Sequence, residues 1–145
     1  MTQPYRQKFT VRYLEVDQQG VVFNAWYLAY MDEALTGWFD HIGLPYAELL
    51  AAGCDAQLVH TELDWTGGLG FGDDASIEVY ALSAGRTSFT VGFTIRRAEE
   101  ALVRARTVYV CVATDGSGKR EMPEKLRAAF TDLAGGNGRG LRQAR

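Results

Sequence analysis

Asp17 is the residue whose type and position most clearly suggest chemistry in this chain. It comes three residues before Gly20 and seven before Asn24, where a long apolar segment begins. A carboxylate beside a helix N-terminus could attack an electrophilic carbon or activate a water, while free helix N–H groups stabilise the oxygen that becomes negative. Gly20 would permit the tight turn or close backbone approach that this arrangement needs. The alternative is that Asp17 only forms the turn, a common use of Asp.

Two elements with different periods would position Asp17. Apolar and polar residues alternate over residues 8–17, which predicts a strand with Asp17 at its end, pointing to the apolar side. Over residues 24–42, apolar side chains recur at helical spacing in two broad stripes. This pattern predicts a long helix that is covered on most sides. Asn24 is a suitable N-cap for it, and Gly43 a suitable stop.

The remainder of the chain supplies most of a sheet and two short helices. Turn-forming clusters of Gly, Ser and Asp separate the strand-like segments. One long helix and about five mostly antiparallel strands must share a core, which predicts one α+β domain with a curved sheet wrapped around the helix. The domain is expected to cover residues 1–131, with a flexible Gly- and Arg-rich tail at 132–145. The further predicted helices are 45–53 and 122–130, and the further strands 56–65, 75–83, 87–97 and 101–115.

The composition excludes several classes of protein. Hydrophobic residues make up 47% and charged residues 23%, as in ordinary globular proteins, and the net charge of -3 gives no footprint for nucleic acid. No apolar run is long enough for a membrane span, and the N-terminus lacks the apolar core of a signal peptide, so a cytoplasmic protein is expected. Cys54 and Cys111 lack metal-ligand spacing and are expected to be buried. No metal or redox cofactor is implied.

A longer motif includes Asp17. The run D-x-x-G-V-V-F-N-x-x-Y-L, from Asp17 to Leu28, resembles the hot-dog-fold acyl-CoA thioesterases, and most closely the branch of 4-hydroxybenzoyl-CoA thioesterase and the Tol-Pal-associated thioesterases. The segments FGDDASIEV, GRTSFTVGFTI and REMPEKLRAAF match later family segments in order, so the resemblance covers roughly residues 5 to 130. It implies a hot-dog fold and the hydrolysis of acyl-CoA thioesters to a carboxylic acid and coenzyme A.

The resemblance also implies a catalytic group. The family's catalytic carboxylate corresponds to Asp17, and the backbone N–H that polarises the thioester carbonyl belongs to the region of Asn24, after the turn at Gly20. Asp17 could form a mixed anhydride as a nucleophile or activate a water as a general base, and both mechanisms remain open. The histidine that many Tol-Pal-associated members have near Phe23 is absent here.

Substrate-binding residues are expected in two segments, one at the start of the long helix and one in a later turn. Arg86 suits the phosphates of coenzyme A, and the adjacent hydroxyl groups add donors. Trp65 and Phe71 flank a glycine-rich loop and could line an acyl or pantetheine channel, or pad a dimer interface. The substrate-binding residues predicted in this way are Phe23, Tyr27, Arg86, Thr87 and Ser88.

Other polar residues have simpler interpretations. Glu33 lies on the long helix, where other hot-dog branches place their catalytic acid, but a solvated helix residue or a salt-bridge partner is the favoured interpretation. His60 is expected to be a hydrogen-bonded structural residue, and His41 to interact favourably with the helix C-terminus. Lys119 and Arg120 are second choices for phosphate contacts, with solvated loop charges as the equal alternative.

A single hot-dog sheet leaves an edge strand exposed. The resemblance implies that two sheets join edge to edge in a homodimer, or a homotetramer formed from two dimers, with the site between subunits. Acyl-CoA is the expected partner, and neither nucleic acid nor membrane is expected. Two alternatives stay open: a thioesterase that acts on an acyl carrier protein, and a hot-dog protein that binds acyl-CoA without turnover.

Overall fold

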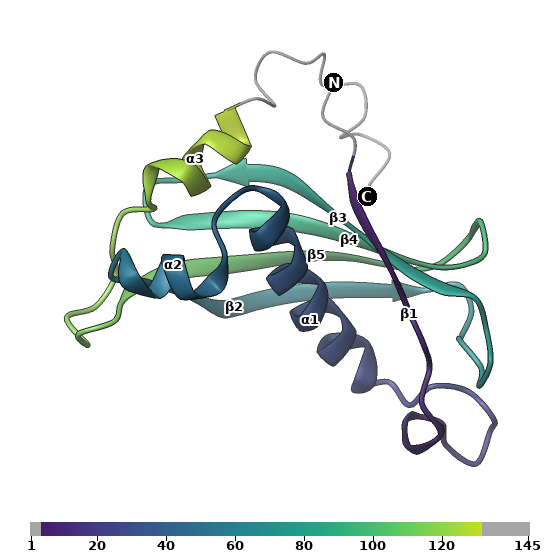
Figure 1. The fold of residues 1–145 in the computed structure, drawn as a ribbon. Coiled ribbons are helices and arrows are strands. Elements are labelled where there is room, and N and C mark those ends of the chain that lie inside the picture. Colours follow the sequence, from purple (N-terminus) through teal and green to yellow (C-terminus); the bar gives the residue numbers. More distant parts are fainter. Residues whose placement is uncertain (1–3, 132–145) are drawn as a thin grey trace.

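The computed structural model describes residues 4–131, so the tail predicted at 132–145 lies outside the described part of the chain. The strands β1, β3, β4, β5 and β2 lie in that order in one sheet, and every neighbouring pair is antiparallel (Figure 1). The central strands are therefore neighbours in sequence, whereas β2 crosses to the far edge and pairs with β5. The strands are β1 (Tyr5–Phe9), β2 (Cys54–Trp65), β3 (Ala75–Ala84), β4 (Ser88–Arg97) and β5 (Glu100–Ala113).

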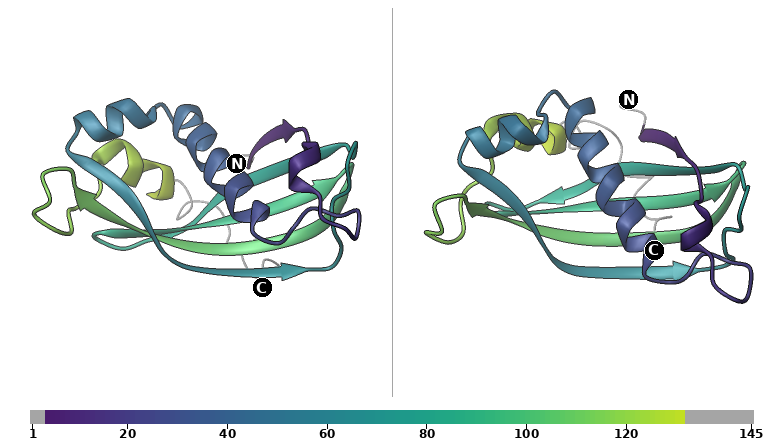
Figure 2. Two further views of the ribbon diagram at one scale, coloured as in Figure 1. Left: turned by 90° about the horizontal axis from the view of Figure 1, so that it is seen from below. Right: turned by 60° about the horizontal axis from the view of Figure 1, so that its bottom comes forward.

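The helices lie on the concave side of this curved sheet. The long helix α1 (Trp26–His41) crosses the sheet diagonally, and α2 (Tyr46–Ala51) and α3 (Glu124–Thr131) lie toward one end (Figures 1 and 2). The arrangement confirms the predicted α+β class and the curved antiparallel sheet around one long helix. The left view of Figure 2 shows that the sheet is a single layer.

One face of α1 forms the centre of the core. The ring of Phe39 lies 6.4 Å from that of Phe89 in β4, and Phe89 stacks on Tyr109 of β5 at 5.3 Å. Burial of these large apolar side chains between helix and sheet supplies the main driving force for folding. The α1 residues buried in this core are Tyr27, Tyr30, Met31, Ala34, Leu35, Trp38 and Phe39.

The opposite face of α1 is open, which corrects the prediction of a helix covered on most sides. Asp32, Glu33 and Thr36 are exposed, and the apolar Leu28 is 42% exposed. The physical reason is that one sheet can cover only one side of a helix. The apolar Leu28 must therefore remain exposed in a single chain.

Two further predictions are corrected at the start of the chain. The strand predicted for residues 8–17 ends at Phe9, and the 3₁₀ turn η1 (Tyr13–Glu15) follows, so Asp17 lies in a loop. A local bond competes with strand pairing here, because the Glu15 carboxylate accepts the backbone N–H of Arg12. Helix α1 begins at Trp26, and Asn24 forms no side-chain cap.

The loops fall at the two ends of the sheet. Phe9 pairs with Ala75, and Ala75 with Arg97, so the loop after β1, the loop before β3 and the β4–β5 turn share one end. Cys54 pairs with Ala113 near the other end, where the β3–β4 turn and α3 also lie (Figure 1). This division decides which candidate residues can meet within one chain.

Candidate active site

Asp17 closes a tight turn. Its backbone N–H donates to the carbonyl oxygen of Val21 at 2.9 Å, and its carbonyl oxygen accepts the N–H of Gly20 at 3.0 Å. The side-chain Oδ1 accepts the N–H of Gln19 at 2.8 Å, while Oδ2 has no hydrogen bond within residues 4–131. Gly20 has a φ of 78°, a left-handed conformation that favours glycine. Asp17 therefore forms the turn through Oδ1, and Oδ2 remains available to react with a ligand or a water.

The loop that carries Asp17 is anchored on both sides. Val16 and Val22 form an antiparallel bridge, which joins the two arms of the loop. The N–H of Val22 donates to the carbonyl oxygen of Leu69 at 2.8 Å, and Val21 bridges Gly70. The Asp17 loop thus packs against the glycine-rich loop between β2 and β3.

Free N–H groups lie just before the first turn of α1, next to this loop. The N–H groups of Trp26, Tyr27 and Leu28 already donate to carbonyl oxygens three residues earlier, at 3.0 to 3.3 Å. By contrast, the N–H groups of Asn24 and Ala25 make no hydrogen bond to the described part of the chain, and both residues are exposed. The side chain of Phe23 beside them is 52% exposed. A carbonyl oxygen of a ligand could accept bonds at this position.

Tyr27 has a structural role that the sequence did not predict. It is only 1% exposed, its hydroxyl accepts the N–H of Leu69 at 3.0 Å, and its ring contacts that of Trp65 edge to face at 5.9 Å. Burial raises the pKa of this phenol. These contacts hold the glycine-rich loop on α1, and the substrate contact predicted for Tyr27 stays a prediction.

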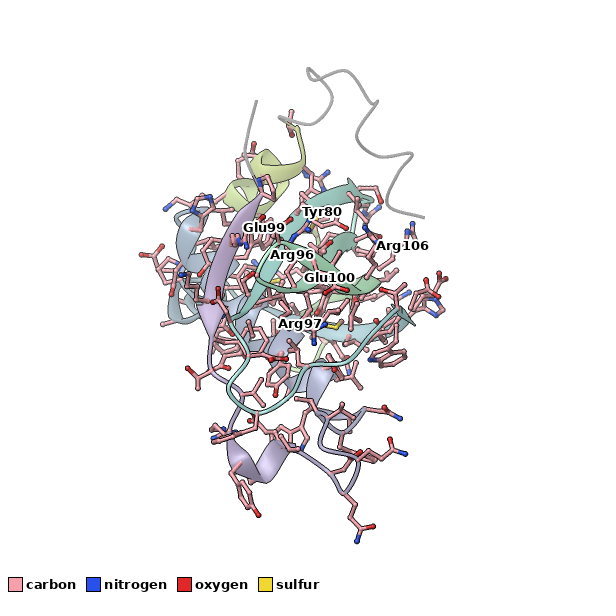
Figure 3. All side chains as sticks on the ribbon, turned by 90° about the vertical axis from the view of Figure 1, so that its right-hand side faces the viewer. Tyr80, Arg96, Arg97, Glu99, Glu100 and Arg106 are labelled. Carbon is pink, nitrogen blue, oxygen red and sulfur yellow. The ribbon has the colours of Figure 1, made fainter. Side chains whose placement is uncertain are left out.

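Arg97, whose side chain lies near Glu100 (Figure 3), also contacts the glycine-rich loop. Its Nη1 donates to the carbonyl oxygen of Gly68 at 3.3 Å and lies 3.5 Å from Asp73, and its Nη2 donates to Glu100 at 3.1 Å. These acidic partners raise the pKa of Arg97, first through the hydrogen bond to Glu100. Arg97 was not predicted from the sequence. An arginine at the end of a strand, together with the acidic pair Asp73 and Asp74 in the loop before β3, is nevertheless a recognisable pattern.

The predicted phosphate-binding turn does not meet Asp17 within one chain. Arg86 and Thr87 lie between β3 and β4, and Ser88 begins β4, all at the opposite end of the sheet. The ten residues of β4 separate the two ends, a length of about 33 Å at the usual rise of a strand. The side chain of Arg86 is mostly exposed and pairs with Glu121 at 3.1 Å.

The remaining candidates occupy peripheral positions. His60 pairs with Glu62 at 3.1 Å on the exposed β2, and the ring of His41 stacks on Tyr5 at 5.1 Å. Cys54 and Cys111 are buried free thiols, as predicted, and burial raises the pKa of both. Residues 4–131 contain no cluster of three potential metal ligands among His, Cys, Asp and Glu. Within the same range, no helix has the length and apolar character needed to cross a bilayer.

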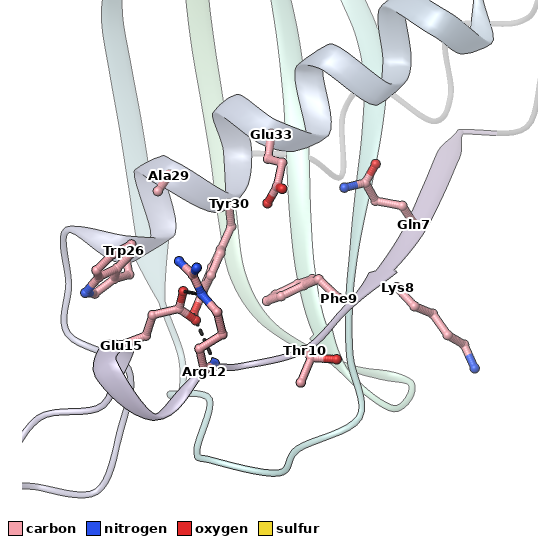
Figure 4. A pocket seen from close by; sticks show the side chains of 10 residues that line it. All are labelled: Gln7, Lys8, Phe9, Thr10, Arg12, Glu15, Trp26, Ala29, Tyr30 and Glu33. Atoms are coloured by element: carbon pink, nitrogen blue, oxygen red, sulfur yellow. Dashed lines mark hydrogen bonds and ion pairs between the residues drawn. The ribbon is translucent and has the colours of Figure 1, made fainter.

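Glu15 is the second residue that sequence reasoning missed. Its carboxylate is 2% exposed and lies in the wall of a cleft of about 380 Å³ between β1 and α1, together with Arg12, Trp26 and Tyr30 (Figure 4). A continuous strand over residues 8–17 gave no reason to expect a special role for Glu15. The spacing of three residues between Arg12 and Glu15 could, however, have indicated an ion pair. Glu33 also borders this cleft, from the exposed face of α1.

Comparison with known proteins identifies the family. The model of the thioesterase-like superfamily matches residues 11–130. The chain belongs to this superfamily. A 1,4-dihydroxy-2-naphthoyl-CoA hydrolase of Synechocystis is 29% identical to it over 122 residues, which cover 82% of this chain and 88% of that protein. A hydrolase of the same name from Synechococcus elongatus is 24% identical over 125 residues, which cover 85% and 92% of the two chains.

Solved structures of the superfamily share the fold. A 1,4-dihydroxy-2-naphthoyl-CoA thioesterase from Synechocystis superposes with a TM-score of 0.79 at 25% identity, covering 91% of this chain and 98% of that one. A DHNA-CoA thioesterase from Staphylococcus aureus gives 0.85 at 15% identity, covering 94% and 95%, which shows the likeness of fold alone. The superfamily member described here therefore has the hot-dog fold, and the expectation of a thioester hydrolase is confirmed at the level of the family.

Proposed function

We propose that this thioesterase hydrolyses acyl-CoA thioesters to a free carboxylic acid and coenzyme A. The observation that carries the proposal is the single loop that places the Asp17 carboxylate before the free N–H groups of Asn24 and Ala25. A carboxylate can supply the nucleophile or base for thioester hydrolysis, and unsatisfied N–H groups can stabilise the carbonyl oxygen as it becomes negative. The hydrolases of 1,4-dihydroxy-2-naphthoyl-CoA among the relatives support acyl-CoA as the class of substrate.

The chemistry follows from the positions of these groups. The thioester carbonyl oxygen accepts hydrogen bonds from the N–H groups at the start of α1, which stabilise the negative charge that develops there. Asp17 either attacks the carbonyl carbon and forms a mixed anhydride, which water then hydrolyses, or removes a proton from the attacking water. In both routes the carbon–sulfur bond breaks, the acyl group gains the water oxygen, and coenzyme A leaves as thiolate and is protonated.

The complete site requires two copies of the chain. Strand β2 pairs with β5 on one side only, and its bulge residue Val59 is 54% exposed. If β2 pairs antiparallel with β2 of a second copy, the two-fold axis brings opposite sheet ends together. The turn of Arg86, Thr87 and Ser88 of one copy then lies at the end that carries Asp17 of the other. The proposed assembly is a homodimer, or a tetramer of two such dimers.

A hydrolysis screen tests the proposal. The purified protein is incubated with aromatic, short-chain and long-chain acyl-CoAs, and the free thiol of coenzyme A is measured with a colorimetric thiol reagent. Hydrolysis of at least one class well above the rate of a protein-free control, and its loss in Asp17→Asn, supports the proposal. If only thioesters of an acyl carrier protein are hydrolysed, the substrate class is that carrier and not coenzyme A. If no thioester is hydrolysed, the proposed function is refuted.

A further inference from the structure

We infer that Glu15 is a positioning residue that fixes the loop of Asp17 on helix α1, so that the carboxylate and the free N–H groups keep a constant separation. The inference rests on the proposed function. Glu15 would act through Asp17 and would not touch the substrate itself. Its test must therefore distinguish a loss of position from a loss of folding.

The carboxylate of Glu15 links two parts of the chain, the segment of η1 and helix α1. Its Oε1 accepts the backbone N–H of Arg12 at 2.8 Å and the hydroxyl of Tyr30 at 2.8 Å, and its Oε2 accepts Nε of Arg12 at 2.7 Å (Figure 4). Arg12 in turn lies over the ring of Trp26, with its guanidinium carbon 5.7 Å from the ring centre. Because Trp26 and Tyr30 are one helical turn apart in α1, both contacts attach η1 to the first turns of this helix.

The backbone of Glu15 carries this attachment to the catalytic loop. Its carbonyl oxygen accepts the N–H of Phe23 at 2.9 Å, and the bridge of Val16 with Val22 follows. Asp17 comes two residues after Glu15, and Asn24 comes one residue after Phe23. A shift of Glu15 would therefore move the acid and the oxygen-binding N–H groups relative to each other.

Stability alone does not account for a carboxylate at this position. Burial of a charged group carries a desolvation penalty, which a well-packed apolar residue would avoid, and buried ion pairs often add little net stability. A buried, fully bonded carboxylate does select one arrangement of its partners. Burial acts to raise the pKa of Glu15, but the hydrogen bonds from Arg12 and Tyr30 outweigh it and lower the pKa below its usual range.

Glu15→Gln is the most specific variant. The amide oxygen can replace Oε1 and still accept bonds from Arg12 N and Tyr30, but the amide NH₂ then faces Nε of Arg12, donor against donor. We expect kcat for acyl-CoA to fall about 10- to 100-fold, as for a misplacement of about 1 Å, with KM changed less than about threefold. Glu78→Gln is the matched control, since Glu78 accepts Nε of Arg96 at 2.7 Å in β3, and it should leave kcat unchanged.

A double variant distinguishes a change in the position of Asp17 from a general loss of folded structure. If Glu15 acts through Asp17, the variant Glu15→Gln/Asp17→Asn should be no slower than Asp17→Asn alone, within about threefold. Hydrogen exchange should also show faster exchange of the Val22 and Phe23 amides in Glu15→Gln, with β4 amides unchanged. Should Glu15→Gln not fold, Tyr30→Phe removes one bond to the carboxylate and should lower kcat in the same non-additive way.

Three outcomes would overturn the inference and leave the proposed mechanism in place. Unchanged kcat in a folded Glu15→Gln protein would show that the carboxylate does not position the acid. Multiplication of the two losses in the double variant would show an effect independent of Asp17. An equal loss in Glu78→Gln would show that loss of any arginine–glutamate pair of this kind has the same effect. Full activity of Asp17→Asn would refute the proposed mechanism first, and this inference with it.

Discussion

Replacement of Asp17 by Asn is the most direct test of the proposed mechanism, because the structure separates its effects on folding and chemistry. The turn depends on Oδ1, which accepts the N–H of Gln19, and the amide oxygen of Asn can accept the same bond. The NH₂ group replaces Oδ2, which has no partner within residues 4–131. The free energy of unfolding should therefore change by less than about 0.5 kcal/mol, as at an ordinary surface site.

The effect on turnover should be large. An amide is a poor nucleophile and cannot remove a proton at neutral pH, so kcat should fall by roughly 10² to 10⁴, or about 2.7 to 5.5 kcal/mol of activation free energy. KM should change far less, because the N–H groups of Asn24 and Ala25 and the contacts to coenzyme A remain. Steady-state release of coenzyme A thiol measures both constants, and chemical denaturation confirms that the variant is folded.

Glu33→Gln is the paired control on α1. This residue is exposed beside the cleft and is the rival candidate for the catalytic acid, so its replacement should leave kcat within about twofold of the wild-type value. If Asp17→Asn retains normal turnover and Glu33→Gln abolishes it, the acid belongs to the helix. The assignment of the mechanism to the loop would then be wrong.

The remaining predictions concern ligand binding, assembly, pH dependence and stability. Arg86→Ala should weaken binding of acyl-CoA by about 1.5–3 kcal/mol, measured as a roughly 10- to 150-fold rise in KM, and should spare a short pantetheine thioester, whose equal loss would exclude a phosphate contact. Val59→Lys at the β2 edge should shift the protein from dimer toward monomer in ultracentrifugation and reduce activity, and an unchanged dimer would place the interface elsewhere. Hydrogen bonds lower the pKa of Glu15 in the folded state, so its contribution to stability is complete above the unfolded pKa near 4.3 and is lost as the pH falls through the folded pKa. Acid denaturation should therefore reduce the free energy of unfolding less in Glu15→Gln than in the wild type. Tyr27→Phe leaves the buried N–H of Leu69 without its partner and should lower the free energy of unfolding by about 1–3 kcal/mol, which urea denaturation measures.

Local periodicity determined much of the secondary structure. Phe89, Val91, Phe93 and Ile95 alternate in β4, and all four are buried, as the pattern predicts. Helix α1 lies inside the predicted range 24–42, and Gly43 follows its end with a φ of 80°. These features depend on residues within a few positions of one another, so a sequence can specify them without knowledge of the fold.

The interruption of the first strand depended on side-chain bonds that the alternating pattern does not show. Phe9, Val11 and Tyr13 share the period of a strand, yet the chain leaves the sheet after Phe9. Glu15 bonds the backbone of Arg12 and the hydroxyl of Tyr30, which comes fifteen residues later. The contact to Tyr30 forms only once α1 packs beside η1, and tertiary contacts of this kind override local propensity.

The motif around Asp17 predicted a catalytic loop, but only the tertiary structure showed which residues lie near that loop within one chain. Tyr27 lies ten residues after Asp17 and belongs to the core, while Arg86 lies at the far end of the sheet. Distance along a chain does not define distance in a folded sheet, because the antiparallel order β1-β3-β4-β5-β2 returns the chain to each end in turn. The sequence therefore predicted Asp17 and its turn as the place of the acid, whereas the bonds of Glu15 and the separation of Asp17 from Arg86 arose from packing between segments far apart in the chain.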